Sequence, residues 1–175
     1  MKNKYIIDYE QFQINEIIIT PLETKYEVKT RPSMIFQNQL DYEFHFETAS
    51  GNKYVLDLIY LVEKISRFAG RIIFNISFTE LSQHDINDET KYEKETEINE
   101  PIELMKRLIF ILKDIDTTII RKLVRNPIYV IGITKNIKKI NFYRNIIKDS
   151  LKTYTEVKDK SSINNGVDAY YYFEK

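Results

Sequence analysis

The two histidines are the first residues whose chemistry needs an account, since an imidazole can ligate a metal or act as a base. His45 lies on the polar side of an alternating segment, and His84 precedes the acidic run Asp85–Glu89. Neither has a second histidine three or four residues away, the spacing that aligns two ligands on a helix. The acidic run departs from a calcium loop, because Thr90 stands where glycine is needed and Thr96 where glutamate is needed. We therefore expect no metal site.

The chain has few residues that could act in nucleophilic catalysis. There is no cysteine, so thiolate nucleophiles, disulfides and zinc–sulfur sites are excluded. A serine or threonine nucleophile needs a neighbouring base that a third group orients, and neither histidine stands in such a pattern. Sequence spacing does not locate paired carboxylates. The sequence therefore predicts a protein that is not an enzyme, with no catalytic residue and no cofactor.

Basic residues dominate one stretch and could bind phosphate groups. Residues 121–152 contain nine Lys/Arg and one acid, with Tyr129, Phe142 and Tyr143 among them. Such a stretch can neutralise nucleic-acid phosphates, but its aromatic residues are expected in the core and no groove-reading motif is present. We favour a solvated or protein-facing surface and keep nucleic acid as an alternative. The candidate contact residues are Arg121, Lys122, Arg125, Lys138, Asn141, Asn145, Lys148 and Lys152.

An acidic stretch offers the basic stretch a partner. Residues 82–100 have a net charge of −5. Residues 1–100 carry 11 Lys/Arg against 18 Asp/Glu, whereas residues 101–175 carry 15 against 8. Complementary patches suit contacts within one subunit and head-to-tail contacts between copies. The acidic candidates are Asp85, Asp88, Glu89, Glu93, Glu95 and Glu97.

The elements that position these side chains begin with an aromatic hairpin. Apolar and polar residues alternate over Tyr42–Thr48, which is the period of a half-buried strand. A turn at Ser50–Asn52 leads to a second strand over Tyr54–Tyr60, and a third strand follows at Arg71–Thr79. Residues 1–32 are interpreted as an extended N-terminal arm.

Two helices and a central strand follow the hairpin. Asn99-Glu100-Pro101 supplies a capping residue and a first-turn proline, so a helix is predicted that ends near Asp116 or continues to Val124. The apolar run Ile128–Ile133 is typical of a buried central strand. The helix before it therefore makes a crossover connection, which should be right-handed.

The last part of the chain is predicted to hold a helix and a hairpin. The helix covers residues 136–151, and the hairpin joins Thr153–Lys158 to Val167–Phe173. The inward-facing residues of the helix are predicted to be Ile140, Tyr143, Ile147 and Leu151.

These elements make one α+β domain of 175 residues, a length that buries an ordinary core. The expected architecture is a mostly antiparallel sheet, with an N-terminal hairpin or meander, one right-handed β-α-β crossover and two main helices packed on one face. Apolar stretches fall short of the ~20 residues that span a bilayer, and the N-terminus has no signal-peptide core.

The order of these features resembles a group of small uncharacterised proteins encoded by tailed bacteriophages. The similarity covers roughly residues 40–150 and includes the hairpin FHFETASGNKYVLDL, the strand end ISFT, and the helices MKRLIFILKDI and NFYRNIIKDSL. The resemblance implies a phage gene product, without an assigned activity. Asn99-Glu100 departs from the Gly-Asp-type turn of that group. The matched positions, all expected in the core, are Phe46, Tyr54, Phe78, Leu112 and Tyr143.

A second resemblance is to the C-terminal end of N-acetyltransferases, through NFYRNIIKDSL and AYYYFEK. Those enzymes hold the coenzyme A pyrophosphate with a glycine-rich loop before the helix. Here that junction reads Thr134-Lys135-Asn136-Ile137, with no glycine beyond Gly132, so several backbone donors would be lost. An acetyltransferase-like enzyme is therefore kept only as a minor alternative.

The function expected from these observations is that of a phage structural or assembly protein, such as a ring-forming connector or a tail-associated virion subunit. Its expected partners are other copies of itself and other virion proteins, and its expected location is the virion or the host cytoplasm. No contact with a membrane is expected. The alternative is a non-virion phage protein that binds a host factor or nucleic acid through the basic surface.

Overall fold

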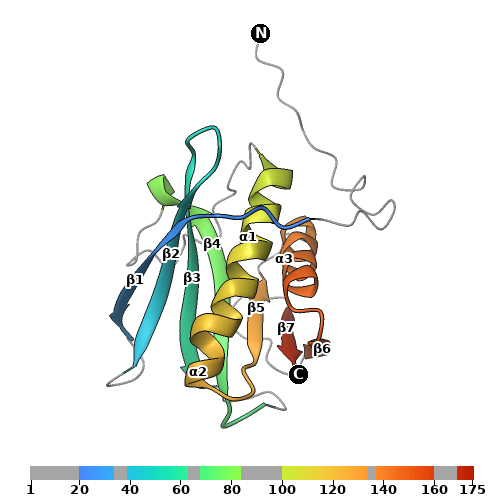
Figure 1. The fold of residues 1–175 in the computed structure, drawn as a ribbon. Helices are drawn as coiled ribbons and strands as arrows, with labels where there is room; N and C mark the ends of the chain where they lie inside the picture. The colour runs from blue at the N-terminus through green and yellow to red at the C-terminus, as the bar shows by residue number, and fades with distance from the viewer. Residues whose placement is uncertain (1–19, 34–38, 63–67, 84–99, 134–136, 160–168) are drawn as a thin grey trace.

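A computed structural model describes residues 20–33, 39–62, 68–83, 100–133, 137–159 and 169–175 of the chain. In it, two helices pack on one face of a seven-stranded sheet, whose strand order is β1-β2-β3-β4-β5-β7-β6 (Figure 1). The strands are β1 (Tyr26–Pro32), β2 (Leu40–Glu47), β3 (Lys53–Val62), β4 (Ile72–Glu80), β5 (Tyr129–Ile133), β6 (Thr155–Asp159) and β7 (Ala169–Glu174). The helices are α1 (Pro101–Ile115), α2 (Arg121–Leu123) and α3 (Ile137–Ser150), and a short 3₁₀ turn covers Leu81–Gln83.

Strands β2 to β4 form the antiparallel meander that the period-two pattern predicts. Strand β1 falls within the predicted arm and extends the meander, antiparallel to β2. The β2–β3 turn contains Gly51 at a φ of +88°, a conformation that glycine adopts without strain. Alternate residues of these strands face the helices, among them Phe44, Leu56 and Phe74, each at most 3% exposed. The aromatic residues of the hairpin therefore build the main core.

The crossover prediction is confirmed. Strand β5 lies parallel to β4, with Phe74 opposite Tyr129, and α1 lies in front of the sheet between them (Figure 1). The connection is right-handed, as the twist of strands requires for a helix that packs back on its own sheet. Both faces of β5 are covered, since Tyr129 is 0% exposed and Val130 on the other face is 2% exposed.

The C-terminal hairpin forms, but the last strand takes the inner position. Strand β7 pairs with β5 on one side and with β6 on the other, and both pairings are antiparallel. Tyr172 and Phe173 of β7 are at most 1% exposed. Tyr172 packs on Phe68 with ring centroids 4.8 Å apart, in a small cluster on the sheet face that the helices leave open. The predicted turn of this hairpin lies outside the described residues.

Helix α1 begins at the predicted proline and buries one broad stripe, including Leu108, Ile109 and Leu112. The predicted capping contact is wrong in one respect. The side chain of Glu100, the N-cap residue, does not cap the helix and instead accepts hydrogen bonds from Ser50 and Asn52. These hydrogen bonds hold the first turn of α1 against the β2–β3 turn. It continues past Ile115 through a π-helical turn at Asp116–Ile120 and α2 to Leu123, which matches the longer of the two predicted ends.

Helix α3 covers its predicted range, but its buried stripe differs from the predicted one. Phe142 and Ile146 are buried together with Ile147 and Leu151, whereas Tyr143 is only partly buried. The Tyr143 hydroxyl reaches β4, where it donates to the carbonyl oxygen of Phe78 at 3.3 Å. The side chain of Ile140 lies outside the described residues. The other matched core positions are buried, namely Phe46, Tyr54, Phe78 and Leu112.

Residues 20–32, the described part of the predicted arm, lie on their own domain. The amide of Leu22 donates to the carbonyl of Lys106 on α1 at 3.3 Å, so the chain crosses α1 before it joins the sheet as β1 (Figure 1). No helix among the described residues is long and apolar enough to cross a membrane.

Candidate interaction surfaces

A buried carboxylate at the end of α1 is the first polar site. Asp116 is 1% exposed and begins the π-helical turn. Its Oδ1 accepts from the hydroxyls of Tyr129 at 2.7 Å and Tyr154 at 2.9 Å, and its Oδ2 lies 2.7 Å from a guanidinium nitrogen of Arg121. One carboxylate thus ties the end of α1 to β5 and to the segment after α3.

The electrostatics of this Asp116 cluster favour a structural role. Burial, followed by the nearby charge of Asp116, raises the pKa values of Tyr129 and Tyr154 well above their ordinary range, so both hydroxyls remain donors. Burial alone would lower the pKa of Arg121, but its hydrogen bond to Asp116 and the charge of that carboxylate outweigh burial and raise it. Both carboxylate oxygens are engaged, so Asp116 is not free to take a proton from a substrate.

Sequence reasoning found Arg121 but not the cluster that it joins. A signal was present: Asp116 follows Leu112 by four residues, which places a carboxylate on the buried stripe of α1. The Thr117-Thr118 pair marks the irregular turn, because both hydroxyls donate to the carbonyl of Asp114, at 2.9 and 2.8 Å. Such bonds compete with regular helical bonding. π-Helical turns occur frequently at functional sites, but here the turn orients a closed internal cluster.

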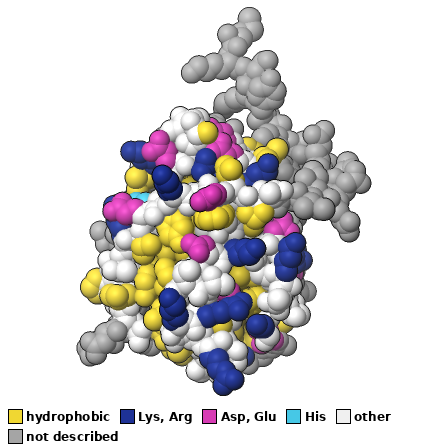
Figure 2. Space-filling view, in the orientation of Figure 1, with side chains coloured by type: hydrophobic (Ala, Val, Ile, Leu, Met, Phe, Trp, Pro, Cys, Tyr) yellow, Lys and Arg dark blue, Asp and Glu magenta, His cyan; other side chains and the backbone are white. Residues whose placement is uncertain are grey.

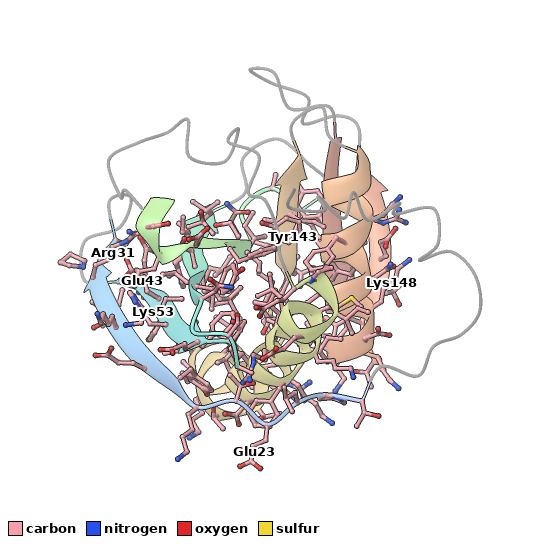
Figure 3. All side chains as sticks on the ribbon, turned by 90° about the horizontal axis from the view of Figure 1, so that it is seen from above. Glu23, Arg31, Glu43, Lys53, Tyr143 and Lys148 are labelled. Carbon is pink, nitrogen blue, oxygen red and sulfur yellow. The ribbon has the colours of Figure 1, made fainter. Side chains whose placement is uncertain are left out.

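A second polar cluster lies on the face of the sheet opposite the helices. Arg31 on β1 contacts two acids of β2: a guanidinium nitrogen lies 3.1 Å from Glu43, and Nε lies 3.7 Å from Asp41. Glu43 also contacts His45, at 2.9 Å between Oε2 and Nε2. Asp41 is 3% exposed and Glu43 is 7% exposed. Figure 3 shows Arg31 and Glu43 together at the β1–β2 end of the sheet.

Burial dominates the electrostatics of this Arg31 cluster. It raises the pKa of Asp41 above its ordinary value, although the amide of Tyr60 and the charge of Arg31 oppose the rise, and Asp57 adds to it. The acids come together through strand register, since Glu43 lies directly opposite Asp57. Within the described part of the chain, no group of three or more acids and histidines is arranged to hold a metal ion.

Only part of the predicted basic surface is free to contact another molecule, because several of its side chains bind within the fold. Lys148 and Arg144 both contact Glu156 of β6, with Nζ of Lys148 at 2.9 Å and Nε of Arg144 at 3.0 Å from Oε2. Burial alone would raise the pKa of Glu156, but these hydrogen bonds and charges hold it below its ordinary value. Asn141 accepts from Arg144 at 3.3 Å. These side chains therefore hold α3 to the C-terminal hairpin.

The remaining candidates are divided between two regions. Lys122 and Arg125 lie exposed at and after α2, and Asn145 and Lys152 lie exposed on and after α3. The side chain of Lys138 lies outside the described residues, as do all six acidic candidates between Asp85 and Glu97. Figure 2 shows Lys and Arg side chains scattered over the helix-bearing face, with acidic side chains between them.

The β1 end of the sheet is open, and sequence reasoning did not single it out. β1 pairs with β2 alone among the described strands, and residues 27–30 are all exposed. Val28 is 44% exposed on the helix-bearing side of β1, and Leu40 at the start of β2 is 43% exposed. Figure 2 shows hydrophobic side chains gathered beside the helices on this part of the molecule. An apolar patch next to an unpaired strand edge is a typical protein-binding surface.

Comparison with known proteins yields no relative. No protein-family model matches the chain, and no curated protein and no solved structure matches it significantly.

Proposed function

We propose that this chain is a non-catalytic phage structural or assembly protein that binds protein partners through the open β1 end of its sheet. The observation that carries the proposal is that β1 pairs on one side only among the described strands, beside the exposed side chains of Val28 and Leu40. Soluble folds usually protect such an edge, so an edge flanked by apolar side chains is best explained by a protein that covers it.

The state of the buried polar groups supports a binding role over a catalytic one. Asp116 accepts hydrogen bonds from two tyrosines and forms an ion pair with Arg121. Glu156 accepts a hydrogen bond from Arg144 and forms an ion pair with Lys148. A general base or nucleophile needs an atom that can reach a substrate. In both clusters the carboxylate oxygens are used to join elements of the fold.

The phage setting rests on the resemblance of residues 40–150 to proteins of tailed bacteriophages. A ring-forming connector or a tail-associated subunit would use such a surface toward its own copies or toward neighbouring virion proteins. Either role also suits the opposite net charges of the two halves of the chain.

The test is the content of purified phage particles. Mass spectrometry is expected to detect the chain in particles, and Leu40→Glu is expected to reduce its incorporation at least tenfold. Leu40 is 43% exposed, so the change does not place a charge in the core. Ile102→Glu is the matched control, since Ile102 is 56% exposed at the start of α1. The Ile102→Glu variant should be incorporated into particles as efficiently as wild type. Absence of the wild-type chain from particles would refute the proposal.

A second candidate function is nucleic-acid binding through the basic surface. Lys122 and Arg125 are exposed and form no ion pair with another described residue, so their charges are available to phosphates. A mobility shift of DNA or RNA that weakens with salt and disappears in Lys122→Glu with Arg125→Glu would favour this candidate.

A further inference from the structure

The backbone of β1 alternates between groups that bond to β2 and groups that face outward. The amide of Ser33 donates to the carbonyl of Gln39 at 2.9 Å, which makes these two residues a hydrogen-bonded antiparallel pair. In an antiparallel ladder every second residue bonds to the same neighbour. Residues 27, 29 and 31 therefore bond to β2, and residues 26, 28 and 30 direct their amide and carbonyl groups outward. Pro32, which lacks an amide hydrogen, falls on an outward position, where it costs β2 no bond.

We propose that two copies of this chain join through their β1 strands, antiparallel, with Val28 directly opposite Val28 of the partner subunit. The proposal rests on the proposed function, because it names a second copy as the partner of the open β1 end. Outward-facing residues can bond only to outward-facing residues. A two-fold axis at Val28 meets this condition, because residue 26 then faces residue 30 of the other copy. The two sheets become one continuous sheet across the axis.

Charge complementarity selects a second copy as the occupant. In this register Glu27 lies opposite the partner's Lys29, and Lys29 lies opposite the partner's Glu27. The side chains of Glu27 and Lys29 are 69% and 49% exposed, and within one copy they are 3.7 Å apart. Directly opposed unlike charges stabilise a strand pair, whereas like charges weaken it. A lysine on an edge strand usually opposes pairing. Here each Lys29 faces a glutamate of the second copy, so the junction contains two pairs of opposite charge.

Other symmetric registers fit less well. An axis at Thr30 would place Lys29 opposite the partner's Arg31 and Val28 opposite the partner's Pro32, which gives a like-charge pair and a missing donor. An axis at Tyr26 would require Thr24 to join the ladder, but Thr24 is 4% exposed and its hydroxyl donates to the carbonyl of Leu22 at 2.7 Å. The chain has therefore left the strand edge at that point.

The apolar patch adds to the same pairing. Val28 lies next to Phe44 in the register of β1 and β2, on the side of the sheet that carries the helices. The axis at Val28 brings the exposed Val28 side chains of both copies together on this side of the sheet. Covering this surface removes apolar area from water, which favours association.

The charge test uses two single variants and their mixture, followed by sedimentation velocity at low salt. Wild type is expected to be dimeric. Glu27→Lys places four lysines at the junction and Lys29→Glu places four glutamates there, so each variant alone should dimerise at least tenfold more weakly. An equimolar mixture should recover dimers, because every 27–29 pair between the two variants is again of opposite charge.

The position test uses the absence of cysteine from the natural chain. Val28→Cys should form a disulfide-linked dimer under mild oxidation, since opposed strand residues lie about 5.5 Å apart between Cα atoms, within disulfide reach. Ile102→Cys is the control, because Ile102 is 56% exposed, against 44% for Val28, and lies off the strand. It should remain mostly monomeric under the same conditions. Circular dichroism spectra should show that both variants remain folded.

The outcomes separate this inference from the proposed function. A wild-type chain that stays monomeric at all concentrations, or dimers that persist equally in both charge variants, would overturn the β1 pairing. The Leu40 particle test would be unaffected by that result. Conversely, dimers with the expected charge behaviour in a chain that is absent from particles would overturn the virion role and leave the pairing in place.

Discussion

Asp116→Ala is expected to lower the free energy of unfolding by about 3–5 kcal/mol, the largest loss among single substitutions at polar sites of this fold. The change leaves the hydroxyls of Tyr129 and Tyr154 and the guanidinium of Arg121 without their shared acceptor. Tyr129 is 0% exposed, so water cannot replace the lost bond there. A buried donor without a partner costs the full desolvation of that group.

Urea denaturation followed by circular dichroism measures this loss. Tyr154→Phe is the matched control, because it removes one donor and leaves Asp116 bonded to Tyr129 and Arg121. That variant should lose only about 1 kcal/mol. A loss below about 1 kcal/mol for Asp116→Ala would show that the cluster does not hold the end of α1 in place.

Arg31→Met is expected to cost about 3 kcal/mol at pH 7, the second-largest of the predicted losses. The substitution keeps an apolar chain of similar length but removes the guanidinium that contacts both Asp41 and Glu43. The negative charges of the buried Asp41 and Glu43 would then lie near each other and near Asp57 without the positive charge of Arg31. Strand β1 would also lose the side-chain contacts of Arg31 with β2.

The loss should depend on pH in a defined direction. The pKa of Asp41 is raised in the folded state, chiefly by burial, so the folded state binds that proton more tightly than the unfolded chain. The stability from Asp41 is complete below its ordinary pKa, about 3.9, and declines as the pH rises through the raised value. Arg31 opposes the rise, so its removal should raise the pKa further and steepen the decline.

Unfolding free energies of Arg31→Met at pH 4 and pH 7 test this sign. The difference from wild type should be smaller at pH 4, and Asp41→Asn in the Arg31→Met background should recover part of the loss at pH 7. An equal loss at both pH values would mean that Asp41 does not carry the effect.

The meander was predictable because its information is local. Alternating side chains and Gly51 specify β2, β3 and the turn between them, and the register follows from which residues must be buried. The proline at 101 and the apolar stripe did the same for α1. The position of β7 was not predictable in this way, because Ala169–Glu174 reads the same whether it is an edge strand or lies between β5 and β6.

The polar sites show the same limit more strongly. The basic residues around α3 are visible in the sequence, but the contact of Lys148 with Glu156 joins elements whose relative placement depends on the whole sheet. The open edge of β1 depends on strand order, which no residue of β1 reveals. What could have been noticed is Asp116 on an apolar stripe, since a buried carboxylate implies donors brought from elsewhere.

The inner position of β7 has a consequence for the order of folding. Strand β5 is complete at Ile133, but the neighbour that covers its second edge is not synthesised until residues 169–174. Until then a chain emerging from the ribosome presents Tyr129–Ile133, a fully apolar strand, with one row of amides and carbonyls unsatisfied. During this interval the free edge of β5 can pair with a wrong strand. Insertion of β7 between β5 and β6 covers that edge.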